Sequence, residues 1–368
     1  MKSLKGLVVN GKFLAAKPTG VHRVAMYLLR ELQKQRATLD EMFSDGMYVL
    51  APRNGKVVSD IKPNELYSHS RLIGQAWEQI ELPVHAHGNL LLSLCNLAPV
   101  ISRNAITMIH DAQVYTSPGS YSFAFRQWYR LVLPRLGRNS LQILTVSEFS
   151  ARQLVEYGVA PADRITVIYN GVDHVLGFAR DATANQRHNL LRHGYVLALA
   201  NTQEHKNIGI LLQAFAMPEM RDLRLVLMGA ATAEDFIAKG HAMPPNVVFV
   251  GKVSDEQMRV LMEEALCFAM PSLTEGFGLP PLEAMMLGCP AVLAPCGSLP
   301  EVGGDSVLYA DPREPGAWRD AVLRLRDEPG LRDQMVDMGR TQSGRFTWAA
   351  AGQRLVDTLR RFASHPPR

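Results

Sequence analysis

The stretch "MPSLTEGFGLPPLEAMMLGCPAVLA", residues 270–294, combines a strand end, a glycine-rich loop, a helix start and a second strand. The apolar runs "LCFAMPS" and "PAVLAP" predict the two strands. Pro280 and Pro281 suit the first turn of a helix that begins near Leu279, because proline lacks the amide hydrogen that this turn leaves unused. The stretch therefore predicts a strand, a loop, a helix and a second strand of an α/β domain.

The same alternation of strands and helices occurs twice along the chain. The strand-like runs of the first half are "GLVVN", "MYVLA", "LLLSL", "AITMIHD" and "LQILTVS", with amphipathic helices predicted at 20–35 and 148–158. Residues 177–193 are polar and predict a linker. The second half contains "YVLALAN", "LRLVLMG", "NVVFVGK" and the two strands of the opening stretch. This pattern predicts two doubly wound, Rossmann-like α/β domains that bind ligands at the carboxyl ends of their strands.

The composition limits the class of protein. A chain of 368 residues is too long for one ordinary core, and 47% hydrophobic with 20% charged residues is typical of a soluble globular protein. There is no apolar run of about 18 residues, which argues against a membrane-spanning helix. The four cysteines form no Cys-x-x-Cys pair, so we expect a reduced, cytoplasmic protein. A P-loop, a dinucleotide fingerprint and an Asp-x-Asp pair are also missing, and no metal site is predicted.

Positive charge is concentrated in the first half. Residues 1–180 contain 20 Lys and Arg against 13 Asp and Glu, whereas the remainder contains 19 against 22. This asymmetry indicates an acidic partner or surface, or else ordinary surface scatter. Within the basic half, "SYSFAFRQWYRLVLPRLGR" places Arg126, Trp128 and Arg130 on a stretch that could lie against an anionic membrane. The alternative is a helix with core aromatics and exposed arginines, and no nucleic-acid-binding motif accompanies it.

Two glutamates flank the glycine loop of the opening stretch. Gly276 and Gly278 allow backbone amides to approach a ligand, and the following helix directs its positive end to the same place, an arrangement common in phosphate binding. The alternative for Glu275 is a capping box with Ser272. The alternative for Glu283 is a carboxylate in the first helical turn, stabilised by the helix dipole.

Three further residues follow strand ends in the two halves. Lys206, in "NTQEHKNIG", precedes a helix and could neutralise a diphosphate, with a solvated lysine as the alternative. His110 ends a buried strand and could donate a hydrogen bond to a substrate hydroxyl. The alternative for His110 is a helix cap or a buried histidine bonded to the backbone. Gly20, in "KPTGVHRVA", offers a second possible amide cradle.

The stretches "TVSEFSARQLVEYGVAPADRITVIYNGVD", "NTQEHKNIGILLQAF" and residues 247–312 resemble glycosyltransferase family 4, the retaining, nucleotide-sugar-dependent enzymes of GT-B architecture. The signature of that family, two glutamates separated by seven residues, corresponds to Glu275 and Glu283. The resemblance implies an acceptor domain over 1–180, a nucleotide-sugar domain over 181–345, and a C-terminal helix over 346–368 that returns to the first domain. The two domains would face each other across a deep cleft.

The resemblance also implies roles for individual residues. Glu275 would contact the donor sugar, Glu283 the ribose, and His110 would lie beside the sugar. Lys206 would pair with the diphosphate. The remaining donor contacts implied by the family are Asn201, Gly276, Phe277, Gly278, Leu279 and Gly20. Many relatives have an arginine where this chain has Asn201 or Thr202, and another where it has His205, so one cationic contact is missing or is supplied elsewhere.

The activity that follows is transfer of a hexose, first of all mannose from GDP-mannose, to a lipid-linked or saccharide acceptor in bacterial polysaccharide or lipopolysaccharide assembly. The reaction would need no metal or cofactor and would take place at the inner face of the cytoplasmic membrane. dTDP-rhamnose and UDP-sugars are alternative donors. A GT-B sugar-nucleotide epimerase and a catalytically silent nucleotide-sugar-binding subunit are alternatives of other classes.

Overall fold

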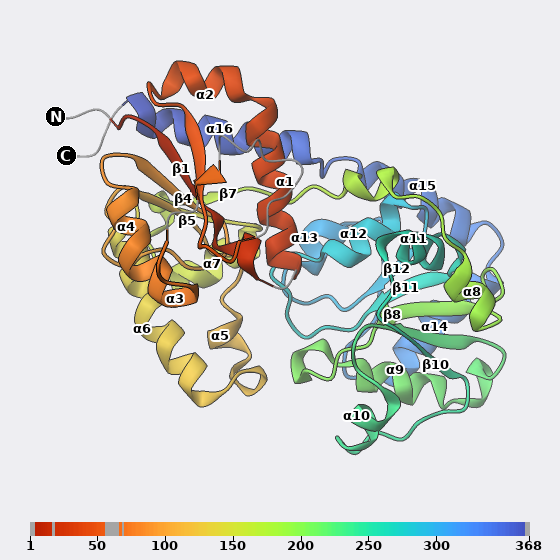
Figure 1. Cartoon of the computed structure of the whole chain (residues 1–368). Helices are drawn as coiled ribbons and strands as arrows, with labels where there is room; N and C mark the ends of the chain where they lie inside the picture. The colour runs from red at the N-terminus through yellow and green to blue at the C-terminus, as the bar shows by residue number, and fades with distance from the viewer. Residues whose placement is uncertain (1–3, 17–18, 56–65, 68–69, 365–368) are drawn as a thin grey trace. The chain divides into compact units, whose positions relative to one another are not determined.

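The computed structural model describes residues 4–16, 19–55, 66–67 and 70–364, and its elements are drawn in Figure 1. The chain forms two compact units. The first unit takes the chain to Tyr115, Tyr121–Asn170 and the C-terminal segment from Trp348, and the second takes Thr116–Ser120 and Gly171–Thr347. Residues 171–180, which the sequence analysis placed in the first domain, therefore belong to the second unit.

The first unit is built on a parallel sheet of seven strands in the order β3-β2-β1-β4-β5-β6-β7. Its strands are β1 (Leu7–Asn10), β2 (Met47–Leu50), β3 (Leu66–Tyr67), β4 (Leu90–Ser93), β5 (Ala105–Met108), β6 (Gln142–Thr145) and β7 (Ile165–Val167). Every residue of β1, β4, β5 and β6 is buried, as expected when helices cover both faces of a parallel sheet. The strand order reverses between β1 and β4, which is where open α/β sheets bind ligands.

Helices from both ends of the sequence complete the first unit. They are α1 (Gly20–Lys34), α2 (Arg36–Met42), α3 (Gly74–Ala76), α4 (Leu82–His85), α5 (Gln113–Thr116), α6 (Phe123–Asn139), α7 (Glu148–Glu156) and α16 (Trp348–Ser364), with the shorter turns η1 (Gly11–Ala15), η3 (Trp77–Glu81) and η5 (Ala162–Arg164). The C-terminal helix α16 packs on α1 and α2, as Figure 1 shows. Trp348 stacks on Tyr27 with ring centroids 4.8 Å apart.

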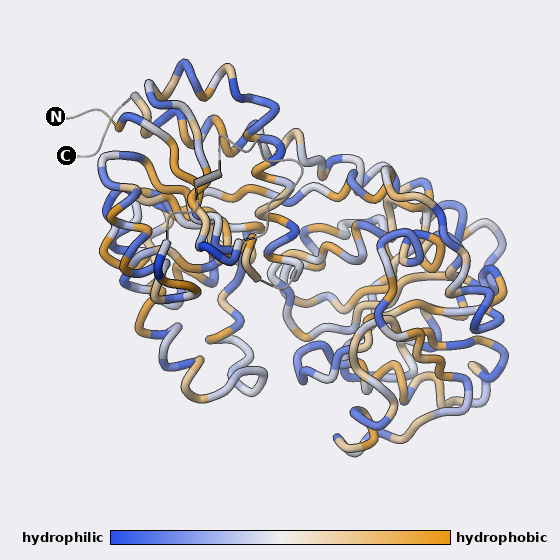
Figure 2. The backbone as a smooth tube through the Cα atoms, in the orientation of Figure 1, coloured by the Kyte–Doolittle hydropathy of each residue, from blue (hydrophilic) through white to orange (hydrophobic). Residues whose placement is uncertain are grey.

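The second unit contains a six-stranded parallel sheet in the order β10-β9-β8-β11-β12-β13. Its strands are β8 (Tyr195–Leu199), β9 (Arg224–Met228), β10 (Val247–Gly251), β11 (Cys267–Met270), β12 (Ala291–Leu293) and β13 (Leu308–Tyr309). Hydrophobic residues follow these strands in Figure 2. The order reverses between β8 and β11, so the loops after these two strands flank the expected ligand position.

Helices cover both faces of the second sheet. They are α8 (Thr183–Arg187), α9 (Ile208–Phe215), α10 (Ala233–Ile237), α11 (Asp255–Glu264), α12 (Leu279–Met286), α13 (Leu299–Gly303), α14 (Pro315–Asp327) and α15 (Leu331–Ser343), with η4 (Pro118–Ser120), η6 (Asp173–Gly177), η7 (Glu204–Lys206) and η8 (Pro218–Met220). Helix α9 packs on α14, and α12 packs on α15. In Figure 1, α9 and α14 lie on one side of the sheet and α12 and α13 on the other. The α/β class predicted from the sequence is confirmed.

Two details differ from the sequence analysis. The segment 177–193, expected to be a linker, contains helix α8, in which Ala184 and Asn185 are buried. Asn185 anchors this helix, since its Nδ2 donates to Glu264 Oε2 on α11 at 2.7 Å. Strands β3, β7 and β13 were not predicted, and each has only two or three residues.

Candidate active site

The loops that follow β8 and β11 are bonded to each other at the reversal point of the second sheet. The main-chain N–H of Leu273 donates to His205 O at 2.8 Å. Asn207 Nδ2 donates to Pro271 O at 3.1 Å and to Pro312 O at 2.8 Å, which ties in the loop after β13 as well. Asn207 has a φ of +54°, a left-handed conformation that asparagine tolerates better than most residues. The carboxyl edge of this sheet is therefore a connected set of loops.

Lys206 and Glu275 meet at this edge. Lys206 ends η7 in the loop after β8, and its Nζ lies 2.7 Å from Glu275 Oε1 in the loop after β11. The two side chains are only 18% and 8% exposed, so the alternative of a solvated lysine is wrong. A charged pair with so little contact with water loses hydration energy, which the attraction between the partners must offset. The pair places an ammonium and a carboxylate where a ligand is expected to bind.

Helix α12 begins at Leu279, as the sequence predicted, with Gly278 as its N-cap at a φ of +107°. Ser272 is buried six residues before that cap, so the capping box that was the alternative for Glu275 does not form. Gly276, Phe277 and Gly278 form the loop between Glu275 and the helix. Pro280 and Pro281 have no amide hydrogen, so Leu279 is the only one of the first three helical residues with an N–H. This N–H and the helix dipole direct positive charge outward, which suits an anion.

The backbone of this loop is fixed by Ser298, which is fully buried at the start of α13. The main-chain N–H of Ser298 donates to Glu275 O at 3.1 Å, and its Oγ lies 3.0 Å from Glu275 O and 2.7 Å from Phe277 O. The neighbouring Gly297 has a φ of +63°, and a Cβ built on it would lie 2.5 Å from Glu275 N. Sequence reasoning missed both Gly297 and Ser298. The left-handed backbone at Gly297 explains why "PCGSLP" has a glycine at this position.

Glu283 lies further along the same helix and is 5% exposed. It is the fifth residue of α12, and the first turn contains no acidic residue, so the helix-dipole alternative for Glu283 is wrong. His174, in η6, lies with its Nε2 3.2 Å from Glu283 Oε1. Sequence reasoning missed His174, because no spacing rule connects two residues so far apart in the chain.

Asn201 lies just after β8, at the same edge of the second sheet. Its Oδ1 accepts from the main-chain N–H of Gln203 at 2.8 Å, and its Nδ2 donates to Gln203 Oε1 at 3.2 Å. These bonds close an Asx turn that shapes the start of the loop leading to Lys206. His205 is also buried, and its Nδ1 lies 2.7 Å from Ser120 Oγ.

His110 follows β5 in the first unit and is 6% exposed. Its main-chain N–H donates to Asn96 Oδ1, and its ring Nε2 lies 2.8 Å from Leu94 O. A carbonyl can only accept, so Nε2 carries the hydrogen and Nδ1 is left as an acceptor. Burial lowers the pKa of His110 to about 4, which keeps the ring neutral at pH 7. His110 was expected to donate a hydrogen bond to a substrate, but its N–H is already bonded to Leu94 O, so this expectation is corrected. The structure shows the alternative, a buried histidine bonded to the backbone.

The lowered pKa of His110 predicts a loss of stability in mild acid. In the unfolded chain this histidine takes up a proton below about pH 6.5, whereas the folded protein resists protonation down to about pH 4. The contribution of neutral His110 to the free energy of unfolding is therefore fully present above about pH 6.5 and is lost as the pH decreases towards 4. His110→Gln keeps a donor for Leu94 and removes the titration. Between pH 7 and pH 4 we expect wild type to lose about 3 kcal/mol more unfolding free energy than the variant, at about 1.4 kcal/mol per pKa unit. Urea unfolding at several pH values measures this, and equal losses in the two proteins would contradict it.

The other predicted residues of the first unit lie on α1 and α6. Helix α1 begins at Gly20, and its N-cap Thr19 makes no side-chain capping bond. On α6, Trp128 is 43% exposed and Phe123 68% exposed, so these aromatics are not core residues as the alternative held. Arg130 is also exposed, and Arg126 lies with its Cζ 5.7 Å from the centre of the Phe123 ring. Helix α6 thus presents apolar and cationic side chains outward.

A polar cluster that the sequence analysis did not predict occupies the reversal point of the first sheet. Lys12 Nζ lies 2.6 Å from Glu78 Oε2, and Asn10 Nδ2 donates to Glu78 Oε1 at 2.8 Å and to Ser93 Oγ at 3.1 Å. Glu78 is 2% exposed and Lys12 is 25% exposed. Asn10 and Lys12 directly follow the apolar run "LVV", and polar residues at a strand end could have marked them as candidate site residues. Glu78 lies in a helical segment and follows no strand, so the sequence gives no such sign for it.

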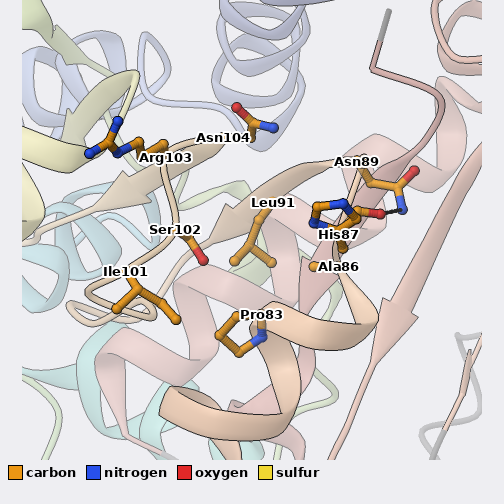
Figure 3. Close-up of a pocket in the computed structure, with 10 residues that line it drawn as sticks. Pro83, Ala86, His87, Asn89, Leu91, Ile101, Ser102, Arg103 and Asn104 are labelled. Atoms are coloured by element: carbon orange, nitrogen blue, oxygen red, sulfur yellow. Dashed lines mark hydrogen bonds between the residues drawn. The ribbon is translucent and has the colours of Figure 1, made fainter. Parts of the chain in front are cut away.

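A pocket of about 310 Å³ lies at the opposite edge of the first sheet. Figure 3 shows its lining, which includes Arg103, Asn104 and Ser102 from the loop before β5, and Asn89, whose Nδ2 donates to His87 O at 3.3 Å. The pocket contains none of the predicted site residues. Within the described ranges, no three His, Cys, Asp or Glu side chains are placed to hold a metal ion. The described helices also include none that is long and apolar enough to cross a membrane.

Comparison with known proteins gives consistent matches along the chain. The family model described as "Glycosyl transferases group 1" matches residues 182–342, and that described as "Glycosyltransferase Family 4" matches residues 18–176. The O-antigen chain mannosyltransferase B of Escherichia coli is 32% identical over 255 residues, which are 66% of this chain and 67% of that protein.

Two solved structures show the same fold at low sequence identity. The sucrose-phosphate synthase of Thermosynechococcus elongatus has a TM-score of 0.75 and 17% identity, covering 98% of this chain and 99% of its own. Anabaena HepE in complex with UDP has a TM-score of 0.71 and 20% identity, covering 97% of this chain and 99% of its own. The predicted GT-B architecture is thereby confirmed.

Proposed function

The chain belongs to the group 1 glycosyltransferases of family 4, and from this premise we propose that it transfers mannose from GDP-mannose to a saccharide or lipid-linked saccharide, without a metal and with retention of configuration. The observation that carries the proposal is the Lys206–Glu275 pair at the reversal point of the second sheet, beside the N-terminus of α12. The choice of mannose is supported by the name of the Escherichia coli relative. Assembly of a bacterial polysaccharide is the corresponding role.

The proposed chemistry depends on charge that develops at the diphosphate. As the bond between the anomeric carbon and the phosphate oxygen breaks, the sugar becomes oxocarbenium-like and the leaving diphosphate gains negative charge. In this proposal Lys206 Nζ and the main-chain N–H of Leu279 at the start of α12 stabilise that charge, because preorganised donors do so without reorganisation cost. Glu275 accepts from a sugar hydroxyl, and Glu283 from the ribose.

Retention follows if the acceptor attacks the face from which the diphosphate leaves. The acceptor oxygen forms the new bond to the anomeric carbon, and its proton passes to the departing phosphate oxygen. Such a step needs no protein base. The ring of His110 is neutral at pH 7 and its Nε2 hydrogen is bonded to Leu94 O, so this scheme gives it no proton to move.

A UDP-sugar is the second candidate donor, because Anabaena HepE, which shares the fold, binds UDP. The test is incubation of the protein with GDP-mannose, UDP-glucose or dTDP-rhamnose, with octyl α-mannoside as acceptor, in EDTA. We expect GDP-mannose to give GDP and a dimannoside with an α linkage by NMR. A β linkage would contradict retention, and loss of activity in EDTA would contradict metal independence. Binding without transfer would identify a silent subunit, and interconversion of donor sugars without an acceptor would identify an epimerase.

The close approach of Gly297 to Glu275 gives a prediction for this activity. Gly297→Ala is expected to lower turnover by about tenfold or more, because the new methyl group displaces the Glu275 loop and a misplacement of about 1 Å can cost 10²-fold. The control is Gly330→Ala, at a φ of +78° with no atom within 4 Å of the added methyl group. Both variants bear the cost of a left-handed alanine, but only the methyl group at position 297 meets backbone atoms, so the lower melting temperature is expected for Gly297→Ala. Lower turnover in Gly297→Ala alone, measured well below both melting temperatures, would support displacement of the Glu275 loop. Equal turnover would contradict it.

We also propose that α6 contacts the anionic membrane surface that carries the acceptor. Support comes from its exposed Phe123, Trp128 and Leu131 together with the exposed Arg130. Wild type is expected to sediment with vesicles containing phosphatidylglycerol but not with phosphatidylcholine alone. The variant Trp128→Ser/Arg130→Ser should bind at least about fivefold more weakly, at about 1 kcal/mol per basic residue plus the lost aromatic. Arg324→Ser, on α14 of the second unit, is the control, and unchanged vesicle binding by the α6 variant would refute the proposal.

A further inference from the structure

His174 and Glu283 form a buried pair in the second unit. His174 Nε2 lies 3.2 Å from Glu283 Oε1, and the two side chains are 2% and 7% exposed. The two atoms are in close contact, but their alignment falls outside hydrogen-bond geometry. The segment η6 packs on α12, and the ring of Phe178 lies edge-on to the imidazole with centroids 5.5 Å apart. The imidazole is therefore held in place from both sides.

The two oxygens of the Glu283 carboxylate have different surroundings. Oε1 lies beside the imidazole, whereas Oε2 makes no hydrogen bond or ion pair with the residues that the structure describes. A buried carboxylate without partners is costly, and the imidazole contacts only one of its two oxygens. The remaining oxygen is available to a donor that is not part of the protein. A ribose offers such donors in its hydroxyl groups.

We propose that His174 is a positioning residue that holds Oε1 of Glu283, so that Oε2 accepts from the ribose hydroxyls of the donor nucleotide. This inference rests on the proposed function, because it takes Glu283 as the ribose contact. It also narrows the substrate class: the donor is a ribonucleoside diphosphate sugar, and the pair discriminates against 2′-deoxyribose. A site built to bond a hydroxyl disfavours the analogue that lacks it, since its own polar group is then left unpaired.

The test is the ratio of affinities for GDP and 2′-deoxy-GDP, measured by titration calorimetry on the whole protein, with UDP and 2′-deoxy-UDP as the second pair. We expect wild type to prefer the ribonucleotide by about tenfold or more, in line with the loss of one charge-assisted hydrogen bond. In His174→Ala the preference should fall to about threefold or less, because the carboxylate is no longer oriented. Glu283→Gln should also reduce it, and His174→Gln, whose amide nitrogen can approach Oε1, should restore part of it.

The matched control is Asn185→Ala. Asn185 Nδ2 donates to Glu264 Oε2 at 2.7 Å, so this variant also removes a buried contact between a short helix and a glutamate of the second unit. A loss of packing alone weakens both nucleotides equally, and this is the result expected for Asn185→Ala. An undiminished ribose preference in His174→Ala would overturn the inference.

Failure of the inference and failure of the proposed function give different results. If wild type binds the ribonucleotide and transfers sugar but His174→Ala keeps the wild-type ratio, only the positioning role is overturned. If wild type binds no nucleoside diphosphate, the proposed function fails and the role of His174 fails with it. Equal affinity of wild type for the ribo and deoxy forms, with transfer intact, overturns the ribose specificity assigned to Glu283.

Discussion

Replacing Lys206 with methionine is expected to lower kcat for sugar transfer by about 10²–10³-fold, the usual effect of removing one preorganised donor from a developing negative charge. Lys206 is the cation that the loops after β8 and β11 hold at the reversal point, 2.7 Å from Glu275 and 18% exposed. Methionine preserves the apolar stem and removes the ammonium, so packing is largely retained. The measurement is steady-state kinetics with GDP-mannose and octyl α-mannoside.

The control for Lys206→Met is Arg324→Met. Arg324 forms an ion pair with Glu328 at 2.7 Å on α14 of the same unit, but that pair is exposed. This variant should retain wild-type kcat, because exposed ion pairs contribute about 0–1 kcal/mol and α14 carries no proposed ligand contact. If Lys206→Met retained kcat within a factor of about three, equal to about 0.65 kcal/mol, the proposed role of Lys206 at the diphosphate would be wrong.

Glu275→Gln should show whether Glu275 contacts the sugar or the nucleotide of the donor. We expect kcat to fall by about 10²-fold, because an amide accepts more weakly than a carboxylate from a hydroxyl of a sugar that is gaining positive charge. The affinity for GDP should stay the same or increase, because Lys206 no longer has a competing carboxylate at 2.7 Å. Calorimetry and kinetics on the same preparation test both expectations. Weaker GDP binding with unchanged kcat would be the opposite pattern and would assign Glu275 to the nucleotide.

The strands that sequence reasoning found are the buried ones. Parallel strands covered on both faces contain nearly continuous apolar residues, as in "LVVN" of β1 and "CFAM" of β11, and their length makes the pattern visible. Strands β3 and β13 have two residues each, too few for any periodic signal. Helix α8 was missed for a related reason: it is short and polar, and a few buried contacts such as that of Asn185 hold it in place.

The candidate site was predictable as a set of strand ends, but not in its contacts. Lys206 and Glu275 each follow a strand, and the carboxyl ends of parallel strands lie at one edge, so their proximity follows from topology. Ser298 bonds to the main chain of Glu275, and His174 lies beside the side chain of Glu283. Both contacts arise from tertiary packing that no spacing rule encodes. His110 was predicted at the right edge of its sheet with the wrong hydrogen-bonding role, because its tautomer depends on the carbonyl of Leu94.

A comparison of GDP with GMP tests most directly whether Lys206 binds the diphosphate of a nucleotide donor. Titration calorimetry in EDTA should show that wild type binds GDP at least about tenfold more tightly than GMP, a charge-assisted contact being worth about 1.5–3 kcal/mol. Lys206→Met should bind the two nucleotides with similar affinity. If wild type does not distinguish GDP from GMP, or if the variant keeps the full difference, the diphosphate does not bind at Lys206.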